Sequence, residues 1–252
     1  MVTLALAAAA FAAPAYAADM AVPPSYNPPA AALPPAMYNW TGIYVGGNVG
    51  GGFLSDSISQ ATPPGPITIS ATQTAHPAGI IGGAQLGANY QFDSWVVGAE
   101  GAWSASNLSG YGISPATGAG VDQERNTSNP LWLAAVSGRL GYAANDWLFY
   151  AKGGGAWMHV QYIQDLLLGG VAGATQIMNV NRAGFVAGGG VEYGLTENLS
   201  ARLEYDFYDF GTKTYQFAAT PVNNTSYLHT ITFGLNWRFT PQPSGQRFCP
   251  TC

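Results

Sequence analysis

The side chains that most often carry catalysis are scarce in this chain. Its histidines are His76, His159 and His229, and Ser226 precedes the last of them with two residues between. A nucleophilic enzyme holds a base beside its nucleophile, so Ser226 and His229, at the start of an expected strand, form the one conceivable pair. His76 lies in a long polar segment and could ligate iron, although a solvated histidine is the commoner case there. We expect no enzyme.

The two cysteines form a Cys-Pro-Thr-Cys motif at Cys249 and Cys252. The spacing matches a redox motif, but neither a βαβ unit nor a following helix accompanies it. In an exported chain, a local disulfide or two free thiols fit the motif better than a redox or metal role. We therefore expect no metal site and no cofactor.

The composition limits the class of protein more sharply. Only 8% of the 252 residues are charged, with a formal net charge of -5, against about 25% charged residues in an ordinary soluble domain. Hydrophobic residues reach only 48%, fewer than a helical membrane protein would carry. No basic surplus supports a nucleic-acid partner, and the 13% aromatic residues argue against a disordered chain.

Eight stretches alternate apolar residues with small or polar ones at a period of two. They cover residues 42–53, 78–92, 95–104, 131–142, 147–161, 182–193, 199–210 and 227–239. Each is near the ~10 residues of a tilted strand that crosses a membrane. Short polar turns (93–94, 143–146 and 196–198) alternate with long polar loops (54–77, 105–130, 163–181 and 211–226). The sequence therefore predicts an all-β fold, an eight-stranded antiparallel up-and-down transmembrane β-barrel.

One face of these strands carries nearly all the charge. Its four acidic and four basic residues are Glu100, Arg139, Lys152, Glu192, Arg202, Glu204, Asp206 and Arg238. Roughly one charge per strand is thin cover for a surface in water, so we place this face in the lumen and the apolar face against lipid. An eight-stranded lumen is filled by side chains. We favour a structural network of ion pairs there; the alternative is a polar path for small solutes.

The aromatic residues of the apolar face support this orientation. They gather toward the short-turn ends (Tyr90, Phe92, Trp95, Tyr142, Trp147, Tyr193, Trp237, Phe239) and toward the long-loop ends (Phe53, Trp103, Trp132, Trp157, Phe185, Phe207, Tyr227). Two aromatic belts around an aliphatic band fit the two interfaces of a bilayer. Trp40 does not fit the alternation, and we place it on the rim.

The two ends of the chain differ from the strands. Residues 1–17 carry no charge and end in Ala15-Tyr16-Ala17, a small-x-small cleavage pattern, which predicts a signal peptide. Residues 18–38 are rich in proline and predict an extended periplasmic linker. The barrel is then expected over residues 39–239, and a C-terminal tail over residues 240–252.

The segment Tyr-Asn-Trp-Thr-Gly-Ile-Tyr-Val-Gly-Gly-Asn at residues 38–48 resembles the opening of a known family. These are the small outer-membrane β-barrel proteins of alphaproteobacteria, described as outer-membrane immunogenic or porin-family proteins with an OmpA-type eight-stranded barrel. The resemblance extends to Phe239. The last strand, with Phe233, Leu235, Trp237 and Phe239 alternating, looks like the signal read by the barrel-assembly machinery.

The resemblance implies a bacterial outer-membrane location and roles in envelope integrity and in host or surface contact, with no catalytic residues. The implied partners are outer-membrane lipid, lipopolysaccharide and the assembly machinery, with a host or surface ligand for the loops. We expect a structural protein that presents surface loops. The alternatives are a small-solute porin and a haem-binding or adhesive surface protein.

Overall fold

The computed structural model describes residues 38–60, 68–69, 73–117, 123–169, 171–217 and 220–239. The chain divides into two units, Met1–Ala36 and Met37–Cys252, and the described residues all belong to the second. The predicted signal peptide, the tail and nearly all of the linker lie outside the described residues. No helix of the described segments is long and apolar enough to cross a membrane.

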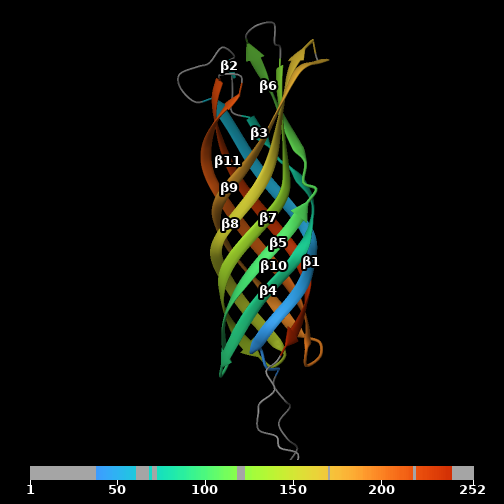
Figure 1. Ribbon diagram of the computed structural model, residues 1–252, viewed down its shortest axis with the longest axis vertical. Helices are drawn as coiled ribbons and strands as arrows, with labels where there is room; N and C mark the ends of the chain where they lie inside the picture. The colour runs from blue at the N-terminus through green and yellow to red at the C-terminus, as the bar shows by residue number, and fades with distance from the viewer. Residues whose placement is uncertain are drawn as a thin grey trace, which may run out of the picture. The chain divides into compact units, whose positions relative to one another are not determined.

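Eight long antiparallel strands close into a ring (Figure 1). They are β1 (Gly42–Gln60), β4 (Ala78–Phe92), β5 (Trp95–Ser106), β7 (Gln123–Ala144), β8 (Trp147–Leu168), β9 (Val171–Gly194), β10 (Leu199–Phe217) and β11 (Thr220–Phe239). Each pairs with its neighbours in chain order, and β11 closes the ring on β1 from Phe239 paired with Ile43 to Val222 paired with Gln60. Three shorter strands, β2 (Thr68–Ile69), β3 (Gln73–Ala75) and β6 (Gly110–Thr117), fall between ring strands along the chain. The predicted eight-stranded barrel is confirmed.

The short connections are turns, as expected. Asp93 and Asn145 each take a positive φ, 50° and 54°, in the β4–β5 and β7–β8 turns. Asn and Asp enter this left-handed region more readily than other non-glycine residues. All three short turns lie at one end of the barrel, so the longer connections gather at the other.

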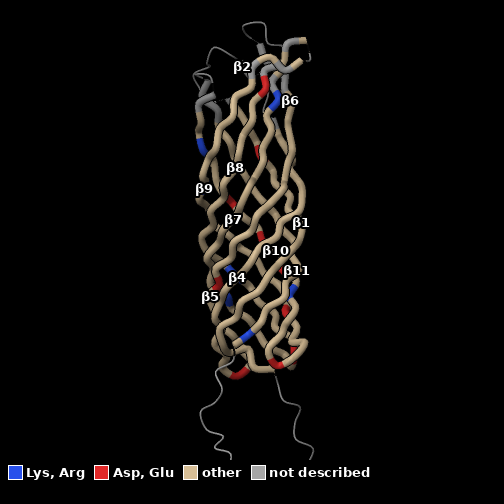
Figure 2. Tube along the Cα trace, turned by 45° about the vertical axis from the view of Figure 1, so that its right-hand side comes forward, with Lys and Arg blue, Asp and Glu red and all other residues tan. Residues whose placement is uncertain are grey.

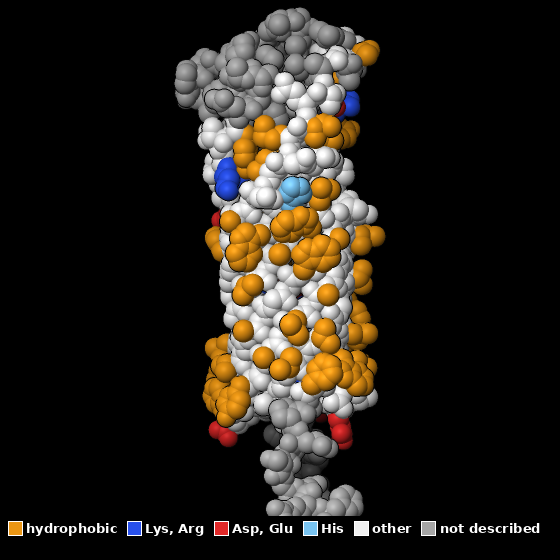
Figure 3. Space-filling model, in the orientation of Figure 1, with side chains coloured by type: hydrophobic (Ala, Val, Ile, Leu, Met, Phe, Trp, Pro, Cys, Tyr) orange, Lys and Arg blue, Asp and Glu red, His pale blue; other side chains and the backbone are white. Residues whose placement is uncertain are grey.

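The direction of the side chains follows the predicted alternation. Ile43, Val45 and Val49 are exposed on the outer wall, whereas Tyr44 between them is buried. Large hydrophobic side chains form two bands around the wall, with smaller ones between (Figure 3). Trp132 and Phe207 are only half-buried members of the outer band, and a register shift between Pro130 and Trp132 turns the strand there.

Two expectations were wrong. The strands run well beyond the predicted ends, and the β8–β9 hairpin takes up almost the whole expected loop 163–181. Beyond the outer belt neither face of a strand needs to meet lipid, so these segments lack the apolar alternation that marks the membrane-crossing part. Trp40 does not lie on the rim but is completely buried, because its indole packs inside the barrel's short-turn end, with Tyr38, Val96, Ala143, Leu148 and Tyr150.

The interior is layered along the barrel axis, as β8 shows residue by residue. Leu148 and Tyr150 belong to the cluster at the short-turn end, and Lys152 follows in a charged layer. Met158 and Val160 then belong to a second apolar cluster. This upper cluster contains Leu54, Ile58, Ile81, Leu108, Leu133, Ala135, Ala156, Met158, Val160, Tyr162, Val186, Tyr208, Phe210 and Leu228. The charged layer is therefore enclosed by apolar side chains on both sides.

Candidate functional site

The eight charged residues that the alternation assigned to one face all point into the barrel. They come from β5 (Glu100), β7 (Arg139), β8 (Lys152), β9 (Glu192), β10 (Arg202, Glu204, Asp206) and β11 (Arg238), and none is more than 8% exposed. Figure 2 shows charged residues along the strands within the lower part of the barrel. Four positive and four negative charges balance, so the layer as a whole is neutral.

The charges pair across the lumen. Lys152 Nζ lies 2.8 Å from Glu204 Oε1 and 3.0 Å from Asp206 Oδ2. Arg202 Nη1 lies 2.6 Å from Glu100 Oε2, although 102 residues separate the two in the chain. Charge-assisted pairs at such distances are the strong class of hydrogen bond, and burial makes the loss of one partner costly.

Arg139 lies at the centre of a second set of contacts. Its Nη2 donates to Glu192 Oε2 at 3.0 Å, and its guanidinium lies 3.9 Å from the centre of the Tyr150 ring. Glu192 also accepts hydrogen bonds from Ser200 Oγ at 2.5 Å and Asn236 Nδ2 at 3.0 Å. Arg238 reaches the same carboxylate more distantly, at 3.7 Å.

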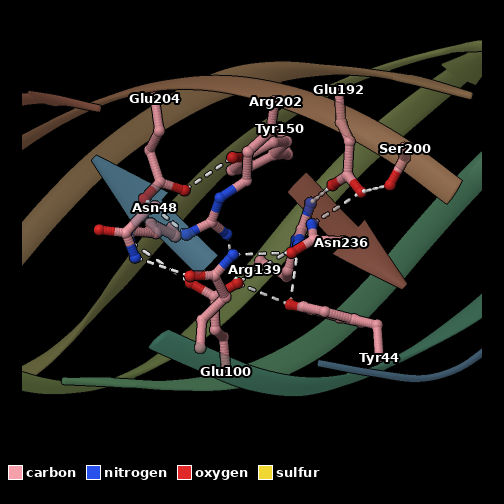
Figure 4. A network of polar contacts seen from close by, with 12 residues as sticks. Tyr44, Asn48, Glu100, Arg139, Tyr150, Glu192, Ser200, Arg202, Glu204 and Asn236 are labelled. Atoms are coloured by element: carbon pink, nitrogen blue, oxygen red, sulfur yellow. Dashed lines mark hydrogen bonds and ion pairs between the residues drawn. The ribbon is translucent and has the colours of Figure 1, made fainter. Parts of the chain in front are cut away.

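Two tyrosines that the sequence did not single out hold this network together (Figure 4). Tyr44 donates to Glu100 Oε2 at 2.7 Å and accepts from Arg139 Nη1 at 2.9 Å. Tyr150 donates to Glu204 Oε2 at 2.6 Å. The alternation of residues along β1 and β8 puts both tyrosines on the same face as the charges, and this position is the sequence feature that could have identified them. A Cβ on Gly87 would collide with the Tyr44 hydroxyl, so the glycine makes room for the phenol.

The charged layer leaves little free space. A cavity of about 20 Å³ borders Lys152, Glu204 and Asp206. One water molecule needs roughly 10–15 Å³ measured in this way, so the cavity suits about one water. The side chains, rather than bulk solvent, fill the barrel at this level.

The cluster at the short-turn end closes the lumen from that side. Arg238 is fully buried, and its guanidinium lies against the neighbouring rings of Tyr38 and Trp40, 4.7 and 4.6 Å from their centres. Its Nη1 also donates to the backbone oxygen of Asn39 at 2.8 Å. These contacts hold residues 38–40 inside the end of the barrel.

A second polar cluster, missed in the sequence, lies within the outer part of the upper apolar cluster, where Asp56 falls between Leu54 and Ile58 on β1. The Asp56 carboxylate accepts hydrogen bonds from Ser128 and Ser226. Arg182 donates to Ser226 Oγ at 2.8 Å and also to Asn224. Asp56 was missed because residues 54–77 were expected to be a loop.

The candidate pair Ser226 and His229 does not form. Ser226 points inward to Asp56, whereas the His229 ring lies outside, with its Nδ1 2.8 Å from the Tyr205 hydroxyl. His159 contacts Asn181, with its Nδ1 2.6 Å from Oδ1, and His76 is exposed. In the described part of the chain, no group of three or more His, Cys, Asp or Glu side chains could hold a metal ion. Cys249 and Cys252 lie outside it.

Known proteins agree with this architecture. The family model for the outer membrane protein beta-barrel domain matches residues 3–239. The 31 kDa outer-membrane immunogenic protein of Brucella melitensis is 33% identical over 94% of this chain and 99% of its own length. The 22 kDa outer membrane protein of Rhizobium leguminosarum bv. viciae is 28% identical over 80% of this chain and 79% of its own.

Among solved structures, the outer membrane protein OprG from Pseudomonas aeruginosa covers 80% of this chain and 98% of its own, with 14% identity and a TM-score of 0.44. The family match spans all the strands of the barrel, and both relatives are named as outer-membrane proteins. The chain therefore belongs to the outer membrane protein beta-barrel family and is a protein of the bacterial outer membrane.

Proposed function

We propose that this protein is a structural component of the outer membrane, with a closed lumen, that supports envelope integrity and presents its long-loop end to the outside. The observation that carries the proposal is the layered interior. The neutral ion-pair layer is enclosed by the Trp40 cluster on one side and the Leu54–Met158 cluster on the other. The lumen charges act as a structural network in this proposal.

The layers oppose conduction for two reasons. A solute entering from the short-turn end would have to displace Trp40 and Arg238, which hold each other through a cation–π contact. It would then have to separate buried pairs such as Lys152 and Glu204, whose charges are shielded from bulk water. Apolar constrictions add a further barrier because they exclude water. The porin alternative therefore requires rearrangement of at least three layers.

Planar lipid bilayers test the closed lumen directly. The refolded protein is expected to insert and to give no conductance steps. The variant Val160→Ala, which trims the upper apolar cluster but leaves the charged layer intact, is likewise expected to give no steps. Regular steps from the wild-type barrel would refute the closed lumen and favour the porin. A deletion strain that becomes sensitive to detergent, and recovers with the wild-type gene, is the expected result for envelope support.

We also propose that β11 carries the signal for the barrel-assembly machinery. Phe233, Leu235, Trp237 and Phe239 all face outward and are 44–57% exposed, so an assembly factor could read them before the strand reaches lipid. Phe239→Ala should lower the amount of folded barrel in cells while leaving refolding from urea into detergent unchanged. Equal loss in both would mean that Phe239 acts only through stability.

A haem-binding role finds less support in the geometry. Haem ligands lie in apolar pockets that enclose most of the macrocycle, whereas His76 is exposed. A haem titration followed by visible absorbance is expected to give no saturable change. The adhesive alternative does have a structural basis, because the strands continue past the outer aromatic belt.

A further inference from the structure

The wall of the barrel is split above the outer belt. β9 and β10 pair only from Gly194 with Ser200 to Phe185 with Asp209. Beyond this point β9 continues to Val171 along β8, and β10 continues to Phe217 along β11. Among the described residues, the segment 171–184 of β9 thus has a ladder partner on one side only. In Figure 1, the β8–β9 hairpin (yellow to gold) and the β10–β11 hairpin (orange to red) end apart at the top.

Two glycines mark where the split begins. A Cβ on Gly184 would collide with the carbonyl oxygen of Asp209, so the two strands are tightly packed there. Two residues beyond Asp209, the register of β10 shifts and Gly211 takes a φ of 61°. A Cβ on Gly211 would meet nothing within 4 Å. The strands therefore pass from close packing to open space within a few residues.

Arg182 stabilises the separated strands. Its Nη2 donates to the backbone oxygens of Gly211 at 2.6 Å and Asn224 at 3.1 Å. The side chain thereby satisfies a carbonyl group of β10, beside which the β9 ladder has ended, and a carbonyl group of β11. The split is thus built into the packing by a fully buried side chain.

Apart from one register shift near its outer end, where Leu166 pairs with Ala174 and Leu167 with Ala172, the free edge of β9 lacks the usual protection against pairing. Natural edge strands carry lysines, prolines or bulges that keep other strands away. Segment 171–184 contains no lysine or proline, and its one charged residue, Arg182, is buried. Val171 and Ile177 are 70% and 61% exposed. Because every second residue of a strand directs its N–H and C=O to one edge, about seven residues offer main-chain groups here.

We propose that the free edge of β9, residues 171–184, is a docking surface for an extended segment of another polypeptide, which adds as a strand through main-chain hydrogen bonds. This mode of recognition draws its affinity from the ladder and its specificity from alternate side chains. With no unburied charge along the edge, the segment that fits is itself neutral and able to adopt a β conformation. The edge lies at the long-loop end, so the partner approaches from outside the cell.

A second copy in the same membrane does not fit this edge. Strands of such barrels tilt by roughly 35–45° from the membrane normal. Two copies related by an axis along the normal would therefore cross their β9 edges at about 70–90°, twice that tilt. Strands of a ladder lie nearly aligned, so self-pairing would make few hydrogen bonds. The partner is a foreign extended chain.

A labelled peptide with the sequence of residues 157–164 serves as the probe. In the barrel this stretch of β8 pairs with β9 from Ala183 to Gln176, so it is already compatible with β9. Fluorescence anisotropy on the refolded full-length protein should show saturable binding, and hydrogen exchange should show alternate amides within 171–184 becoming slow when the peptide is added. A peptide with prolines in place of Val160 and Gln161 loses a donor on each edge and should not bind.

Two protein variants locate the site. Asn179→Pro and Val180→Pro remove N–H groups from opposite edges of β9. The one that affects the free edge should keep heat-modifiable migration and weaken peptide binding about tenfold or more, whereas Asn179→Ser should bind like the wild type. Undiminished binding to both proline variants would overturn the proposal. So would slow exchange of all amides in 171–184 before any peptide is added, since the edge would then already be paired.

Discussion

Replacing Arg139 by methionine tests the ion-pair layer at its centre. The guanidinium donates to Tyr44 and Glu192 and lies over the Tyr150 ring. The methionine side chain would keep the apolar bulk but leave the layer with three positive and four negative charges. Removing one partner of a buried pair costs about 3–5 kcal/mol because the other charge stays buried. Glu192 keeps its bonds from Ser200 and Asn236, so we expect a cost at the lower end of that range.

The double variant Arg139→Met with Glu192→Gln provides the decisive comparison. It restores neutrality, and a glutamine can still accept from Ser200 or Asn236. The uncompensated charge of Glu192 accounts for most of the unfolding free energy that Arg139→Met loses. The double variant should therefore be about 2 kcal/mol more stable than Arg139→Met alone. If the cost instead came from lost packing of Arg139, the double variant would be at least as unstable as the single one.

The assay is urea unfolding of the barrel refolded in phospholipid vesicles, followed by tryptophan fluorescence and by heat-modifiable migration. Glu197→Gln, in the exposed turn before β10, is the control and should change the unfolding free energy by less than about 0.5 kcal/mol. A loss below about 1 kcal/mol for Arg139→Met, or no recovery in the double variant, would contradict the role assigned to the layer.

The Trp40 cluster, the outer wall and the Asp56 cluster give three further tests. Trp40→Ala should destabilise the barrel by about 3–5 kcal/mol in the same urea assay, yet give no conductance steps in planar bilayers, because the charged layer remains; stable steps would place the seal at Trp40 alone. Val136→Arg, on the lipid-facing wall between the belts, should cost about 2–4 kcal/mol, whereas Ile177→Arg, beyond the outer belt, should cost less than about 0.5 kcal/mol; equal costs would contradict the position of the bilayer. Ser226→Ala should raise the urea sensitivity slightly, through the lost hydrogen bond to Asp56, by about 1 kcal/mol; an unchanged midpoint would mean that the Asp56 cluster does not contribute to stability.

The alternation of residues predicted more of this fold than any motif did. On β1, the pattern Ile43-Tyr44-Val45 set which side chains face lipid, because successive side chains of a strand point to opposite faces. The same alternation placed all eight charges in the lumen. It could not pair them, because the contact of Arg202 with Glu100 depends on the closure of the ring and on the stagger of β5 against β10.

The upper half of the interior escaped the sequence for a different reason. Leu54 and Met158 occupy inward positions of β1 and β8, the same parity as polar Asn48 and Lys152. The inward face is polar near the short turns and apolar further out. The alternation of polar and apolar residues therefore stops where the charged layer gives way to the upper apolar cluster. The segments beyond it are rich in Asn, Thr and Gly and were expected to be loops, although their main-chain ladders continue.

The charged layer also explains how this sequence chooses one register. Arg202, Glu204 and Asp206 occupy alternate positions of β10 and all point inward. A slip of β10 by one residue would turn these three side chains to lipid and bring Leu203, Tyr205 and Phe207 into the lumen. Arg202 alone would then cost about 2–4 kcal/mol at mid-membrane, and Lys152 would lose its two nearest carboxylates, those of Glu204 and Asp206. An apolar filling of equal volume could stabilise the barrel as well, but hydrocarbon side chains are tolerated on either face and would penalise the slip far less. The network therefore contributes to the choice of register even if its net effect on stability is small.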